Sequence, residues 1–165
     1  MKSRVALAIF LACIIMGAAA GLHMQSTSGA QTQSFTLTLT GEGYDKTGAP
    51  YAVSITLTGT RGGKPAIVLS LRTKGGNVDV QDYGVFGVSS GPGVLVQKCH
   101  RIWMTIRMTD NPYAGHTVVW HLSGRTESVS EEEASVSFTS NKVIIPLSGN
   151  PKLYDLTLEG TLTLN

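Results

Sequence analysis

The sequence predicts an all-β fold: an antiparallel meander of about 8–10 strands that closes, or nearly closes, into a barrel. Three observations lead to this prediction. Apolar and hydroxylated side chains alternate with period two along much of the chain from Phe35 to Leu164, as in half-buried strands. Clusters of Gly, Asn, Asp and Pro separate these runs at near-regular spacing. No sustained helical period follows the N-terminal segment.

The most regular alternation predicts strands over 35–40, 51–58 and 156–164. In the first of them, Phe35, Leu37 and Leu39 alternate with threonines, so the apolar side chains share one face. Less regular segments complete the expected set: 66–72 and 77–83 as a hairpin around Gly75-Gly76, 94–97, 100–109, 117–123, and 136–139 with 143–147 around a turn at 140–142. The Gly- and Ser-rich stretch 84–93 is expected to be a loop over a barrel mouth, with Val85 and Phe86 exposed.

Three segments resemble one another: TLTLTG at 36–41, SITLTG at 54–59 and DLTLEG at 155–160. They follow no fixed period, so we interpret the likeness as shared strand chemistry and not as a repeat. Their final glycines, and Gly124, are expected to follow strands, at turns or bulges.

Closure into a barrel is expected because the first and last strands are long and leucine-rich, and neither carries a lysine or proline that would protect an open edge. A two-sheet β-sandwich with longer crossovers is the alternative. The expected barrel resembles lipocalin-like barrels in architecture alone, since none of their motifs is present, and a likeness of fold says little about function.

The first thirty residues are predicted to be a signal peptide or an N-terminal membrane anchor. Lys2 and Arg4 precede an uncharged apolar run over residues 5–22, and small residues suit cleavage after Ala20 or Ala30. If the run is retained, it is just long enough to span a bilayer. Either outcome exports residues 31–165, which are expected to form a single all-β domain, secreted or at the cell surface.

Charge argues against a nucleic-acid partner. Without Lys2 and Arg4, 11 basic residues stand against 11 acidic ones, so the exported part is neutral. A membrane partner is expected only through the N-terminal segment, if it is uncleaved. Cys99 is the one cysteine of the exported part, so no internal disulfide is expected, and an intermolecular one stays open.

One weak ligand-binding constellation comes from the aromatic and basic residues in the middle of the chain. Trp103 and Trp120 are both expected to oppose the core face of their strands and to lie near one another across a hairpin. Arg101 and Arg107 share the Trp103 face, and Phe86 belongs to the expected mouth loop. Such a polar and aromatic face suits a carbohydrate or a small planar ligand.

Cys99, His100 and His121 form a weak metal constellation. Thiolate and imidazole suit copper or zinc, but three ligands are fewer than a structural zinc site requires, and adjacent strand residues point to opposite faces. No nucleophile elbow or phosphate loop is present, so we expect no enzyme and no cofactor.

These expectations favour a non-enzymatic extracytoplasmic module that binds a small ligand inside a barrel. A cell-surface structural or interaction domain is the alternative, and a copper- or zinc-binding protein is the third hypothesis.

Overall fold

The computed structural model describes residues 33–62, 68–97, 101–108, 117–129 and 133–165. The described chain is all-β, as predicted, and forms nine strands in one antiparallel sheet. Their bounds are β1 Ser34–Tyr44, β2 Pro50–Gly62, β3 Val68–Val80, β4 Gly84–Val88, β5 Gly91–Gln97, β6 Arg101–Met108, β7 Val118–Val129, β8 Glu133–Ile144 and β9 Lys152–Leu164.

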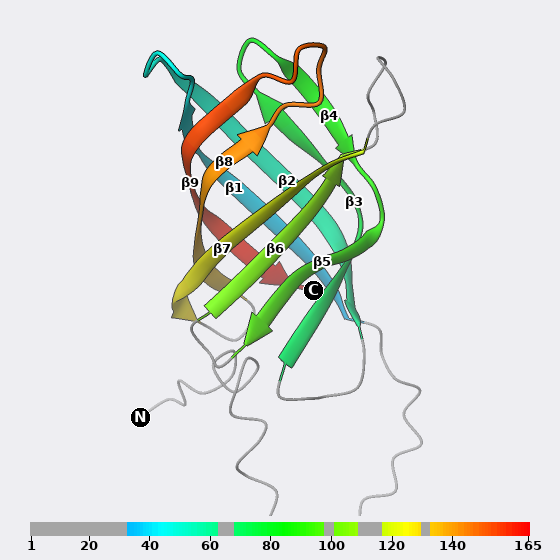
Figure 1. Ribbon diagram of the computed structural model, residues 1–165. Helices are drawn as coiled ribbons and strands as arrows, with labels where there is room; N and C mark the ends of the chain where they lie inside the picture. Colours follow the sequence, from blue (N-terminus) through cyan, green and yellow to red (C-terminus); the bar gives the residue numbers. More distant parts are fainter. Residues whose placement is uncertain (1–32, 63–67, 98–100, 109–116, 130–132) are drawn as a thin grey trace, which may run out of the picture.

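The sheet closes into a barrel because β1 pairs with β2 on one side and with β9 on the other (Figure 1). Eight strands form the closed ring and one strand is extra. The count exceeds eight because two short strands pair along β3. Its segment Val68–Thr73 pairs with β5, and its segment Gly76–Val80 pairs with β4. β4 and β5 therefore share one place in the wall between β3 and β6. The barrel prediction is confirmed, and the sandwich alternative is not the observed fold.

The hairpin predicted around Gly75-Gly76 is wrong, since both glycines lie inside the continuous strand β3. The chain reverses later, where Asp82 (φ 64°) and Gly84 (φ 103°) adopt left-handed backbone conformations. Likewise, the predicted turn at 140–142 lies within β8. Glycine and polar residues indicated turns at these places because such residues are frequent in turns. Here they lie within continuous strands.

The loop predicted over 84–93 is also largely wrong, because β4 and β5 occupy most of it. Val85 is 63% exposed, but Phe86 is only 4% exposed and joins the core. Alternation along β4 sends neighbouring side chains to opposite sides of the wall. Every one of the nine strands contributes buried hydrophobic side chains to the barrel interior, among them Phe35, Leu57, Ile106, Trp120, Phe138 and Leu158.

Five strand glycines lie opposite large core residues and not at turns. The prediction was turns or bulges, and Gly59 does lie at a register shift between β2 and β3. Gly76 pairs with Leu57, and Gly124 pairs with Phe138, whose ring covers it. A Cβ on either glycine would overlap a backbone carbonyl of the neighbouring strand. The same holds for the final glycines of the three similar segments, which pair as Gly41 with Leu158, Gly59 with Phe35, and Gly160 with Leu39. Their likeness therefore agrees with shared strand chemistry: the final glycine of each segment permits close backbone approach opposite a bulky core residue.

The wall opens between β7 and β8 toward one end of the barrel. Pairing runs only from Ser123 with Thr139 to Val129 with Ala134, and the ends of the two strands diverge beyond it (Figure 1). Trp120 fills the opening: its side chain is 1% exposed, and its indole Nε1 donates a 2.7 Å hydrogen bond to the carbonyl of Ile144 on β8. This bond replaces part of the missing ladder.

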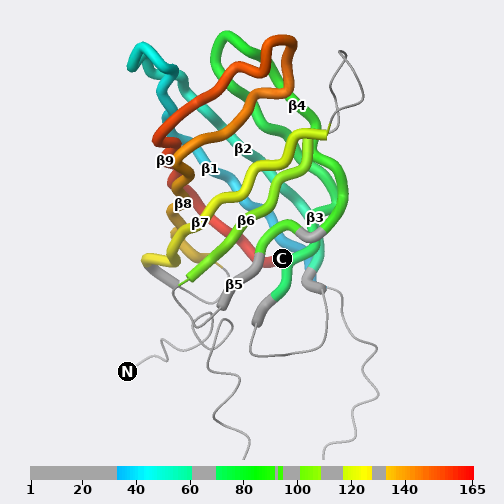
Figure 2. Tube along the Cα trace, in the orientation of Figure 1, coloured from blue at the N-terminus to red at the C-terminus, as the bar shows by residue number. Residues whose placement is uncertain are grey.

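Alternation of strand direction sorts the connections between two ends of the barrel. The turns at 45–49, 81–83 and 145–151 lie together at one end, which we call the turn end, and β1 begins and β9 finishes at the other (Figures 1 and 2). Among the described residues there is no apolar helix of membrane-spanning length.

Candidate functional site

The outer face of β6, β7 and β8 carries an open hollow of about 520 Å³. We call it the wall hollow; its lining residues are Arg101, Trp103, Ser123, Gly124, Arg125, Ser137 and Thr139. Register explains how they meet. Arg101 is paired with Arg125, which is paired with Ser137 on β8, and one outward position along, Trp103 lies opposite Ser123 and Thr139. The two rows are about 7 Å apart, the rise of two strand residues.

The charged row is unusual because two arginines are directly opposite each other. Like charges at paired positions of a sheet destabilise it. The nearest described carboxylates by register are Glu127, the next outward residue of β7, and Glu159, which pairs with Ser137. Neither carboxylate forms an ion pair with Arg101 or Arg125 among the described residues. Both guanidinium groups are exposed and point to the same side of the wall.

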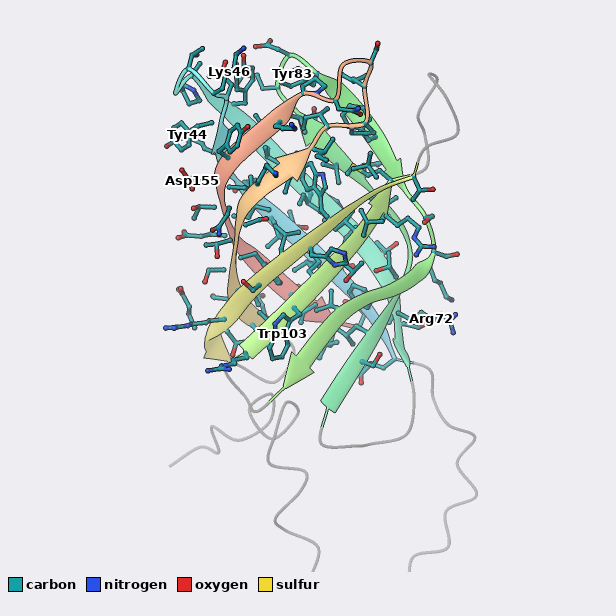
Figure 3. All side chains as sticks on the ribbon, in the orientation of Figure 1. Tyr44, Lys46, Arg72, Tyr83, Trp103 and Asp155 are labelled. Carbon is teal, nitrogen blue, oxygen red and sulfur yellow. The ribbon has the colours of Figure 1, made fainter. Side chains whose placement is uncertain are left out.

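Trp103 is half-buried on the outer face near the strand ends opposite the turn end (Figure 3). The prediction that Trp120 shares this face is wrong. Trp120 pairs with Ile106 and points into the core, whereas its neighbour Val119 is 36% exposed. Val119 and Trp120 are adjacent and both apolar, so alternation alone does not decide which of them points inward. The two tryptophans therefore lie on opposite sides of the wall and do not form a pair.

Arg107 lies on the same outer face as Arg101, as predicted. It is six residues along β6, so about 20 Å separates the two positions, and Arg107 does not line the wall hollow. Phe86 is buried in the barrel interior and is not exposed at a mouth. Of the five residues in the predicted ligand-binding constellation, the structure therefore brings together Arg101 and Trp103, and adds Arg125, which the sequence reasoning missed.

The metal constellation is described only in part, since Cys99 and His100 lie outside the described residues. His121 is exposed on β7, where its Nδ1 lies 3.5 Å from the Thr105 hydroxyl. Within the described part of the chain, no three His, Cys, Asp or Glu side chains gather as a metal site would require.

A second group of residues, which the sequence reasoning missed, lies at the turn end. We call Tyr44, Tyr51, Tyr83 and Tyr154 the tyrosine rim; Tyr44 and Tyr83 are labelled in Figure 3. The rings of Tyr51 and Tyr83 have centroids 5.2 Å apart. Tyr83 and Tyr154 also line a hollow of about 370 Å³ with Lys46 and Lys152. The sequence contained a signal for this group. These tyrosines lie in or near alternate turns of the meander, and alternate turns lie at the same end of a barrel.

At the turn end, the pKa values of two side chains, Asp45 and Tyr51, are shifted. The Thr47 hydroxyl donates to the Asp45 carboxylate at 2.6 Å, the main reason why the pKa of Asp45 lies below its usual value. The backbone N–H groups of Ala49 and Thr47 add to this at 3.0 and 2.7 Å. A hydrogen bond with Tyr83 raises the pKa of Tyr51, with smaller contributions from the charges of Tyr83, Asp45 and Asp82 and from burial.

Comparison with protein-family models, with curated proteins and with solved structures finds no significant match.

Proposed function

We propose that this chain is an exported, non-enzymatic binding domain that takes a small ligand in the wall hollow and not inside the barrel. The proposal is supported by which side chains point into the barrel and which point outward from its wall. Phe86 and Trp120 are packed into the core of the barrel, while Arg101, Trp103 and Arg125 line an open hollow outside.

The chemistry of the wall hollow suits binding. Guanidinium groups donate hydrogen bonds, the indole gives a flat apolar surface, and the hydroxyls of Ser123, Ser137 and Thr139 both donate and accept. The described residues that line it include no carboxylate, imidazole or thiol, so they offer no general base or activated nucleophile.

The two tryptophans provide the test, because they report on opposite sides of the wall. Their indole N–H signals in a ¹H–¹⁵N correlation spectrum are assigned with Trp103→Phe and then followed during a screen of neutral, anionic and cationic small molecules. We expect ligands to move the Trp103 signal and leave that of Trp120 in place. Ligands that move only the Trp120 signal, or no ligand that moves the Trp103 signal, would contradict the proposal.

The tyrosine rim favours a second candidate function, a surface that contacts a macromolecular partner. Tyr44 is 37% exposed, and tyrosine is enriched in protein interfaces. Oxidative footprinting of the protein on the cell that makes it, compared with the isolated domain, tests this candidate. Protection of Tyr44 with unchanged labelling of Trp103 would support it, and equal labelling of Tyr44 in both samples would contradict it.

A further inference from the structure

The charged row of the wall hollow indicates what kind of ligand group it takes. Arg101 and Arg125 face each other across one register position, so their guanidinium groups repel. An oxyanion between them would remove this repulsion and accept hydrogen bonds from both planar groups. Because neither arginine forms an ion pair with a described carboxylate, both remain available to such a ligand.

The neighbouring row indicates what the anionic group is attached to. Trp103 is half-buried and presents its indole beside the hydroxyls of Ser123 and Thr139. The Thr139 hydroxyl lies 3.5 Å from the Ser123 carbonyl, which leaves its oxygen free to accept. A sugar ring matches this row, because its C–H face packs on an indole and its hydroxyls exchange hydrogen bonds with hydroxyls.

We propose, resting on the function proposed above, that the wall hollow binds an anionic saccharide whose carboxylate or sulfate lies between Arg101 and Arg125 and whose ring stacks on Trp103. An inorganic oxyanion would use the arginines alone and leave the indole without a role. A flat lipid surface would not enter a hollow of about 520 Å³ on the side of the wall.

Isothermal titration calorimetry of the folded domain with matched saccharides tests the proposal. The probes are an oligogalacturonate hexamer, the same hexamer with its carboxylates methyl-esterified, and a heparin-derived hexasaccharide. Inorganic sulfate and vesicles of phosphatidylcholine and phosphatidylglycerol at a 3:1 ratio are added as separate arms. We expect at least one acidic hexamer to bind about tenfold more tightly than the neutral ester, since hydrogen bonds to a charged group are among the stronger ones.

Variants then assign the binding to the two rows. Arg101→Gln and Arg125→Gln should each weaken binding of the acidic hexamer about tenfold, and Trp103→Ala should weaken it as well. Arg107→Gln is the matched control, because it removes the same charge from the same outer face about 20 Å away, and it should leave the affinity nearly unchanged. Circular dichroism of each variant confirms that the barrel is intact.

Four results would overturn the inference. They are equal affinity for the acidic and esterified hexamers, equal affinity for inorganic sulfate, binding to the anionic vesicles alone, and no binding by any acidic saccharide. Equal affinity for the esterified hexamer that still depends on Trp103 would overturn only the anionic class, and the proposed binding function would remain. Failure of the indole experiment would overturn both.

Discussion

Two adjacent glycines in β3 allow the role of close backbone approach to be tested in one strand. In Gly76→Ala, the new Cβ would lie 2.9 Å from the Cα of Leu57 on β2 and would overlap the carbonyl oxygen of Thr56. In Gly75→Ala, the new Cβ would meet only the carbonyl oxygen of Val88, at 3.8 Å, which is an ordinary contact. Neither glycine has a positive φ, so the two substitutions differ in space and not in backbone conformation.

The two variants should change stability in opposite directions. Alanine in place of a strand glycine restricts the unfolded chain and stabilises the fold by about 0.4–1 kcal/mol when nothing else changes. We expect this gain for Gly75→Ala. At Gly76 the obstacle is backbone, which cannot rotate away, so β2 and β3 must separate at a cost of about 1–3 kcal/mol or more. Because the gain from restricting the unfolded chain is common to both variants, they should differ by the cost of separating the strands, about 1–3 kcal/mol or more.

Chemical denaturation followed by circular dichroism measures this difference, and the denaturant midpoints of the two variants should lie on either side of wild type. Thermal unfolding gives an independent check, at roughly 3–4 °C for each kcal/mol in a domain of this size. If Gly76→Ala were as stable as Gly75→Ala, the close approach of β2 and β3 at this position would be wrong, and with it our explanation of the strand glycines.

Three further predictions concern single side chains. Trp120→Phe should lose about 1–3 kcal/mol of stability, because the carbonyl of Ile144 loses its hydrogen bond; Trp103→Phe, measured in the same denaturant series, should cost much less, and equal losses would contradict the sealing role. The pKa of Asp45 is lower in the fold than its value of 3.8 in model compounds, so its contribution is present above about pH 4 and disappears as pH falls through the depressed folded pKa. The difference in melting temperature between wild type and Asp45→Asn should thus shrink below pH 4, and a difference that stays constant to pH 2 would refute this. Thr73→Val should stabilise the fold by about 1 kcal/mol, since the Thr73 hydroxyl is buried with no hydrogen-bond partner among the described residues; a destabilised variant in the same assay would indicate that the hydroxyl does have a partner.

Local pattern was a sufficient guide wherever a strand has one apolar and one hydroxylated face. Leucine and threonine alternate in β1 and β9, so their inward faces, their antiparallel pairing and the closure of the barrel could all be predicted. The local pattern did not predict the roles of the glycines. Residue type does not distinguish a glycine that permits a turn, such as Gly84, from one that permits two strands to approach, such as Gly76.

The candidate site depended on register, which the sequence does not state. Arg101 and Trp103 were singled out because they share a face of one strand, but Arg125 joins them only through the pairing of β6 with β7. That pairing also sends Trp120 into the core, where the apolar neighbours Val119 and Trp120 gave no indication of direction. Alternation of side chains along each segment was enough to predict strands with one apolar and one polar face, because alternation is a local property. The polar residues that lie side by side could not be predicted, because their proximity depends on how separate strands align in the folded barrel.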